Sequence, residues 1–205
     1  MRTLLNFINR SCDGQDKEIV LFQRNTVANM NELTVAWKVI RYCGFGCHHP
    51  FVYADETEVA YSDEFGNFAP RKTAAPGQMF SVVPTPSGRR LVASGDATSP
   101  TEIQVLNALP RGAVNINFYR NNQLLTVKPW VAPGQKAVFS FLPTLWIGVA
   151  SQVVQGEPLS SAILSNVNQE LPLQGVASAD LVMTGGGAGS DSISYVFALE
   201  NVVMR

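Results

Sequence analysis

Two cysteines and two histidines lie within seven residues, in the stretch Cys43-Gly-Phe-Gly-Cys47-His48-His49. Thiolate and imidazole groups are the usual zinc and copper ligands, and cysteines four residues apart across two glycines could face one ion. A histidine and a downstream acid such as Asp55 could complete the ligand set. The stretch therefore predicts a candidate zinc or copper site formed by Cys43, Cys47, His48 and His49.

Two other interpretations of the same stretch stay open. Cys43 and Cys47 could form a redox disulfide, or they could be reduced thiols buried in an ordinary loop. The remaining cysteine, Cys12, has no second cysteine beside it, and adjacent histidines on a strand point to opposite sheet faces. Three cysteines are too few, and odd in number, for a disulfide framework. This count favours reduced cysteines in a protein that is cytoplasmic as synthesised.

Nucleophilic or acid–base catalysis has little support. His48 and His49 are the only histidines, so a triad base must be one of them, and no Gly-x-Ser-x-Gly elbow exists. The acid pairs lie in turn-like stretches, where carboxylates are usually solvated. The glycine-rich stretch 185–189 lacks the Lys-Ser/Thr ending of a phosphate-binding loop, and we expect a hairpin tip or a close backbone approach there. We therefore expect no enzyme activity and no cofactor, with the metal ion above as the alternative.

Trp130 is the best candidate for an exposed binding residue. It lies between Pro129 and a Pro-Gly turn, whereas Trp37 and Trp146 lie in strand-like stretches where core packing is expected. Asn121 and Asn122 form a polar turn nearby in the sequence. Trp130, Asn121 and Asn122 are therefore the candidate residues for binding a glycan or lipid surface.

The charge pattern bears on possible partners. The formal net charge is −1, only 15% of residues are charged, and no run of Lys and Arg reaches three. These values argue against a nucleic-acid footprint and a polybasic membrane patch. A chain with so little self-repulsion and so few surface charges can associate with itself, and we expect homo-oligomers or higher assemblies.

The elements that must position these residues are β-strands. Between Val114 and Val149, apolar residues alternate with polar ones, and turn residues punctuate them at 120–122 and 133–134. This region predicts an antiparallel meander of three or four strands. Turn signals every 8–12 residues elsewhere predict about a dozen strands. We expect one all-β domain over residues 1–205, an antiparallel β-sandwich of jelly-roll type.

Four local features complete the prediction. Leu33 to Tyr42 alternates well enough to form one continuous strand. Asp13-Gly14 predicts a turn, and residues 155–169 could hold a short helix. Ala-Pro-Gly-Gln occurs at 75–78 and again at 132–135, each time before a strand with Phe. This repeat either marks two equivalent corners of a pseudo-repeated sandwich or reflects how often Pro-Gly precedes a strand.

The first residues resemble a mature strand more than a signal peptide, because Asn6 and Asn9 interrupt any apolar core. No apolar run approaches the length of a membrane helix. Export by a route without such a signal stays possible.

Several motifs between Ile19 and Val83 resemble the rhizosphere-induced proteins of soil bacteria. They are Val-Leu-Phe-Gln at 20–23, Thr-Val-Ala-Trp-Lys at 34–38, Phe-Val-Tyr at 51–53 and Pro-Gly-Gln-Met-Phe at 76–80. They cover less than half of the chain. The resemblance implies a bacterial, non-enzymatic protein and supplies no catalytic residues.

The sequence thus favours a structural or self-assembling protein, a subunit of an oligomer, fibre or particle. A lectin-like or membrane-active binding module is the first alternative. A β-sandwich metalloprotein that uses the Cys43–His49 loop is the second.

Overall fold

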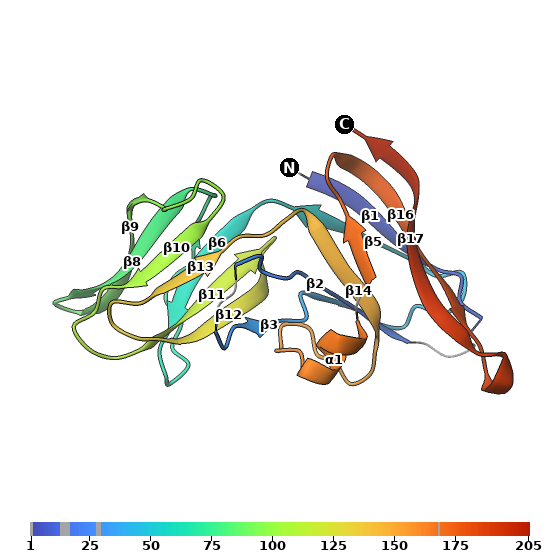
Figure 1. The fold of residues 1–205 in the computed structure, drawn as a ribbon, viewed down its shortest axis with the longest axis horizontal. Helices are drawn as coiled ribbons and strands as arrows, with labels where there is room; N and C mark the ends of the chain where they lie inside the picture. Colours follow the sequence, from blue (N-terminus) through green and yellow to red (C-terminus); the bar gives the residue numbers. More distant parts are fainter. Residues whose placement is uncertain (1, 13–16, 28–29, 168) are drawn as a thin grey trace. The chain divides into compact units, whose positions relative to one another are not determined.

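A computed structural model describes residues 2–12, 17–27, 30–167 and 169–205 of the chain, and they are almost entirely β-structure (Figure 1). Their strands form four separate sheets, three of four strands and one of five. The predicted all-β, sandwich-like fold is confirmed. The turn predicted at Asp13-Gly14 lies outside the described residues.

The chain groups into two compact units, where the sequence suggested a single sandwich. Unit 1 comprises Met1–Gln23, Ala36–Asp55 and Pro143–Arg205; unit 2 comprises Arg24–Val35 and Glu56–Leu142. Each unit contains two of the four sheets. The chain passes between the units four times within strand-and-turn sequence, so no linker-like composition marks the boundaries.

Unit 1 holds two four-stranded sheets. The order of the first is β17-β16-β1-β5, with β1 parallel to β16 and the other pairs antiparallel. The order of the second is β15-β14-β2-β4, antiparallel throughout. The strand bounds are β1 Arg2–Asn9, β2 Glu18–Phe22, β4 Lys38–Ile40, β5 His48–Ala54, β14 Thr144–Ala150, β15 Gln169–Pro172, β16 Val176–Gly186 and β17 Ile193–Met204.

Unit 2 holds the other two sheets, in the orders β13-β10-β8-β9 and β3-β12-β11-β6-β7. The pair β8–β10 is parallel and the other pairs are antiparallel. The strand bounds are β3 Leu33–Thr34, β6 Thr57–Ser62, β7 Lys72–Thr73, β8 Gln78–Thr85, β9 Gly88–Asp96, β10 Ile103–Asn107, β11 Val114–Arg120, β12 Gln123–Val131 and β13 Lys136–Phe139.

Each unit buries large aromatic side chains between its elements. In unit 2, Phe118 of β11 packs on Phe139 of β13 with ring centroids 5.0 Å apart, which joins the two sheets. In unit 1, buried Trp37 meets Tyr53 of β5 edge to face at 6.1 Å. Trp146 stacks on Phe22 at 6.4 Å. Trp37 and Trp146 therefore serve the packing role that the sequence assigned to them.

The predicted meander from Val114 to Val149 is correct only for its first hairpin. β11 and β12 pair through a two-residue turn in which Asn121 and Asn122 have φ of 50° and 61°. Positive φ at both central residues matches the right-handed twist of the two strands that a two-residue turn joins. β13, however, pairs with β10, and β14 lies in the other unit beside β2 and β15. Turn residues specify where a strand ends, but not which strand becomes its neighbour.

The predicted continuous strand from Leu33 to Tyr42 is wrong. β3 pairs with β12 in unit 2, whereas β4 pairs with β2 in unit 1. The backbone amide of Val35 donates to Leu125 (3.2 Å), and that of Ala36 donates to Glu157 (3.0 Å). Val35, Ala36 and Trp37, between the two short strands, are all buried, so their apolar character reflects burial and not one continuous strand.

The Ala-Pro-Gly-Gln repeat forms two equivalent turns. In each, the Gln amide nitrogen donates to the Ala carbonyl at 3.0–3.1 Å, and the Gln side-chain oxygen accepts from the Ala amide. The turns precede β8 and β13, which flank β10 on its two sides. The Gly77 amide donates to the carbonyl of Glu102, directly before β10, and the Gly134 amide donates to that of Asn107, the last residue of β10. Both turns belong to one sheet of unit 2, so the repeat does not mark the division into two units.

The predicted short helix is present as α1 (Ser161–Asn166), capped by the Ser160 side chain, which accepts from the Ile163 amide (3.3 Å). A one-turn 3₁₀ helix, η1 (Gly189–Asp191), lies between β16 and β17.

Candidate functional site

The cysteines of the candidate metal loop form a disulfide. Cys43 and Cys47 are bonded, with their Cα atoms 5.1 Å apart, inside the usual range for such a bond. The backbone and side chain of Asn9 anchor this loop: Asn9 Nδ2 donates to the Cys43 carbonyl (2.7 Å), and the Gly46 amide donates to the Asn9 carbonyl (2.7 Å). The structure thus adopts the disulfide that the sequence left as an alternative to a metal site or reduced thiols.

The two histidines lie on opposite faces of β5, as adjacent residues on a strand must. Nδ1 of His48 lies 3.2 Å from Asn6 Nδ2, whereas burial, and then the charge of Lys38, lowers the pKa of His49. Within the described residues, no three His, Cys, Asp or Glu side chains gather where they could hold a metal ion. The structure therefore does not bring the predicted ligand set together.

Trp130 is exposed, as predicted, with 64% of its surface accessible. It has a φ of 56°, which is unusual for a bulky residue, and it lies where the β11–β12 register shifts. Its amide donates to Asn115 Oδ1 (3.0 Å), which holds the bulge in place.

Asn121 and Asn122 do not share a site with Trp130. They form the opposite end of the hairpin, eight or nine residues away along β12, which is roughly 26 Å at about 3.3 Å per residue. Their backbone groups make hydrogen bonds that fix the turn: the Asn121 amide donates to the Glu56 carbonyl (2.9 Å), and the Arg71 side chain donates to the Asn122 carbonyl (3.1 Å).

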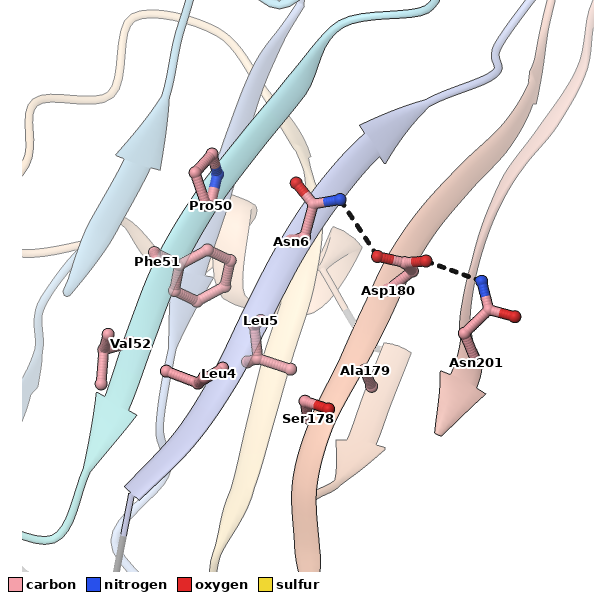
Figure 2. Close-up of a pocket in the computed structure, with 10 residues that line it drawn as sticks. All are labelled: Leu4, Leu5, Asn6, Pro50, Phe51, Val52, Ser178, Ala179, Asp180 and Asn201. Atoms are coloured by element: carbon pink, nitrogen blue, oxygen red, sulfur yellow. Dashed lines mark hydrogen bonds between the residues drawn. The ribbon is translucent and has the colours of Figure 1, made fainter. Parts of the chain in front are cut away.

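A hollow of about 510 Å³ lies on the sheet β17-β16-β1-β5, and no sequence motif indicates it. Figure 2 shows its lining, drawn from all four strands of that sheet. Leu4, Pro50 and Val52 give it an apolar side, and Leu4 is 52% exposed. Asn6, Asp180 and Asn201 give it a polar side.

Two amide groups hold the Asp180 carboxylate, one at each oxygen (Figure 2). Asn201 Nδ2 donates to Oδ2 at 2.7 Å, and Asn6 Nδ2 donates to Oδ1 at 3.0 Å. Because these bonds favour the ionised form, first that of Asn201 and then that of Asn6, they lower the pKa of Asp180. The hollow therefore presents a fixed negative charge beside an apolar surface.

The position of Asn201 depends on an irregularity in β17. Asn201 has a φ of 49°, and the β16–β17 register shifts between Asp180 and Ser178. The bulge allows its side chain to reach Asp180 on the neighbouring strand.

The other feature of this sheet is its long edge strand. β17 has twelve residues and ends the strand order, with β16 on its inner side. It contains no proline or lysine, its single charged residue is Glu200, and several of its large apolar side chains are exposed: Ile193, Val196, Val202, Val203 and Met204. At mid-strand, the Gln169 side chain bonds the Phe197 backbone, accepting from its amide (2.9 Å) and donating to its carbonyl.

The other edge strands are short or protected. β3, β4, β7, β13 and β15 have two to four residues each. β5 contains Pro50, and β9 carries Arg89, Arg90 and a register shift opposite β8. Short length, proline, charge and bulges are the usual means of keeping sheet edges from pairing. Within the described residues, β17 is the long edge without proline or lysine and with the most exposed apolar side chains, although its pairing with β16 also contains register shifts.

Comparison with known proteins gives no relative: no family model, no curated protein and no solved structure matches this chain. The resemblance to rhizosphere-induced proteins stays a prediction. No helix in the described part of the chain has the length and apolarity needed to span a membrane.

Proposed function

We propose that this protein is a non-enzymatic structural protein whose copies associate through the edge of β17. The observation that carries the proposal is the contrast among the sheet edges, in which β17 alone combines length, exposed apolar side chains and a single charge. A strand of this kind is a template for pairing with a second strand. The net charge of −1 adds little repulsion between copies.

The C-terminal half of β17 is the expected pairing segment. Gln169 already occupies the Phe197 backbone groups, so a partner strand meets less competition beyond that point. Val202, Val203 and Met204 lie there, each more than two-fifths exposed. Pairing two such strands hides both their backbone edges and these side chains from water.

A matched pair of double variants tests the edge. Val196→Lys with Val203→Lys places two charges on β17, which should block strand pairing and leave monomers. Thr184→Lys with Ser178→Lys places the same two charges on the cross-strand neighbours of those residues in β16, one strand inward from the edge.

Analytical sedimentation measures the mass of each double variant in solution. Dissociation of the β17 variant alone, with circular dichroism unchanged in both, supports pairing at the edge. Equal association of both variants, or equal loss in both, contradicts it, because the charge change is the same and only its distance from the edge differs.

Trp130 motivates a second candidate, a glycan-binding module. An indole that is 64% exposed and held at positive φ by Asn115 is a ready stacking surface for a sugar ring. Trp130→Ala should then abolish retention on a glycan array, whereas Phe45→Ala, which removes an exposed aromatic ring from unit 1, should not. Absence of retention by the unmodified protein would end this candidate.

A further inference from the structure

We infer that the hollow on the sheet β17-β16-β1-β5 binds a small organic cation with an apolar body, of the alkylammonium class. The cationic head would lie on the Asp180 carboxylate, and the alkyl chain would lie along Leu4, Pro50 and Val52 (Figure 2).

Among the described side chains, none forms an ion pair with Asp180. The charges of His48 and Arg10 act on its carboxylate from a distance, and Arg10 is engaged with Glu200 at 2.9 Å. Its two contacts are neutral amides, which orient the carboxylate without cancelling its charge. Charge complementarity therefore favours a cation over an anion or a neutral solute.

The carboxylate also keeps room for more hydrogen bonds. An ionised carboxylate has about four acceptor positions, and the two asparagines use one on each oxygen. An ammonium group, with its several N–H donors, can take the remaining positions.

The rest of the hollow suits an apolar chain. Three carbon-rich side chains form one side of it, and Leu4 is half exposed. The volume of about 510 Å³ lies within the range of small-molecule sites, roughly 300–1,000 Å³. Strand pairing at β17 would extend the sheet sideways and leave this face open, so the inference does not depend on the proposed association.

The test is calorimetric titration of the full chain with n-hexylammonium chloride, with n-hexanol and sodium hexanoate as matched probes. We expect saturable binding of hexylammonium only, and weaker binding of shorter alkylammonium ions. Asp180→Asn should weaken hexylammonium binding at least tenfold, whereas Asp191→Asn, which removes an exposed charge on η1, should leave it unchanged. Leu4→Asn should remove the gain in affinity with chain length.

Several outcomes overturn the inference: no saturable hexylammonium binding, equal binding of hexanol, or unchanged affinity in Asp180→Asn. Because Asp180→Asn also disturbs two asparagine contacts, circular dichroism establishes that it folds. If it does not fold, the comparison of the three probes on the unmodified protein still decides between a site for cations and an apolar hollow without charge preference.

Discussion

Gly185 is a position where the backbone leaves no room for a side chain. It lies near the end of β16 with φ of +90°, and a Cβ atom there would collide with the carbonyl of Ser194 on the returning chain. The glycine-rich stretch therefore forms the tip of the β16–β17 hairpin and is also a place of close backbone approach, so both alternatives that the sequence suggested apply.

Gly185→Ala should lower the free energy of unfolding by about 3 kcal/mol, from about 1–2 kcal/mol of left-handed backbone strain and a similar cost for displacing Ser194. Gly189→Ala is the control, since it has φ of +61° with open space around its Cβ position, and should cost only the strain. Urea unfolding measures both; equal costs would contradict the collision.

His49 should make stability depend on pH. Burial, then the charge of Lys38, lowers its pKa in the folded protein below the ordinary 6.5. The unfolded chain therefore binds the proton more readily, so the free energy of unfolding falls as pH drops through 6.5 towards the folded pKa. His49→Gln should flatten this slope in urea titrations at several pH values; an unchanged slope would refute the assignment.

Asp180 shows why the hollow could not be predicted from sequence. Its hydrogen-bond partners Asn6 and Asn201 lie 174 and 21 residues away, and no local motif connects them. Trp130, by contrast, could be predicted as exposed, because the proline before it and the turn after it are local signals. Side-chain exposure at a turn depends on local sequence, whereas a site assembled across four strands depends on the register in which those strands pair.

At the scale of elements, strand positions were more predictable than strand partners. Alternation and turn residues located the β11–β12 hairpin, and the absence of a strand pattern in residues 155–169 indicated the short helix α1. The partners of β13 and β14 were missed because long-range pairing depends on burial against distant strands, which a turn does not encode.

The proposed association surface is the edge of β17, where the Gln169 side chain already occupies the Phe197 backbone groups. Gln169→Ala should uncover the Phe197 amide and carbonyl and strengthen association at least about fivefold, since one more hydrogen bond contributes about 1 kcal/mol. Gln174→Ala is the control, because Gln174 is exposed and lies in the turn between β15 and β16. Sedimentation equilibrium compares the dissociation constants, and weaker or unchanged association of Gln169→Ala would argue against pairing along this part of the edge.

At the scale of the whole molecule, the sequence pattern predicted the fold class but not the division of the chain. Hydrophobic alternation and regular turn signals indicated an all-β protein, and the four sheets agree. The two units were not predictable because each is built from separate segments, with residues 24–35 and 56–142 forming unit 2 between segments of unit 1. Hydrophobic alternation is the same in both units, so the sequence carries no boundary signal.

The measurement that tests the central claim most directly is the mass of the unmodified protein by light scattering over a range of concentrations. Pairing through β17 predicts a mass that rises with concentration to a multiple of the 22.3 kDa chain. A mass that stays at 22.3 kDa at every concentration would contradict the account, because an edge strand that never pairs is not an assembly surface.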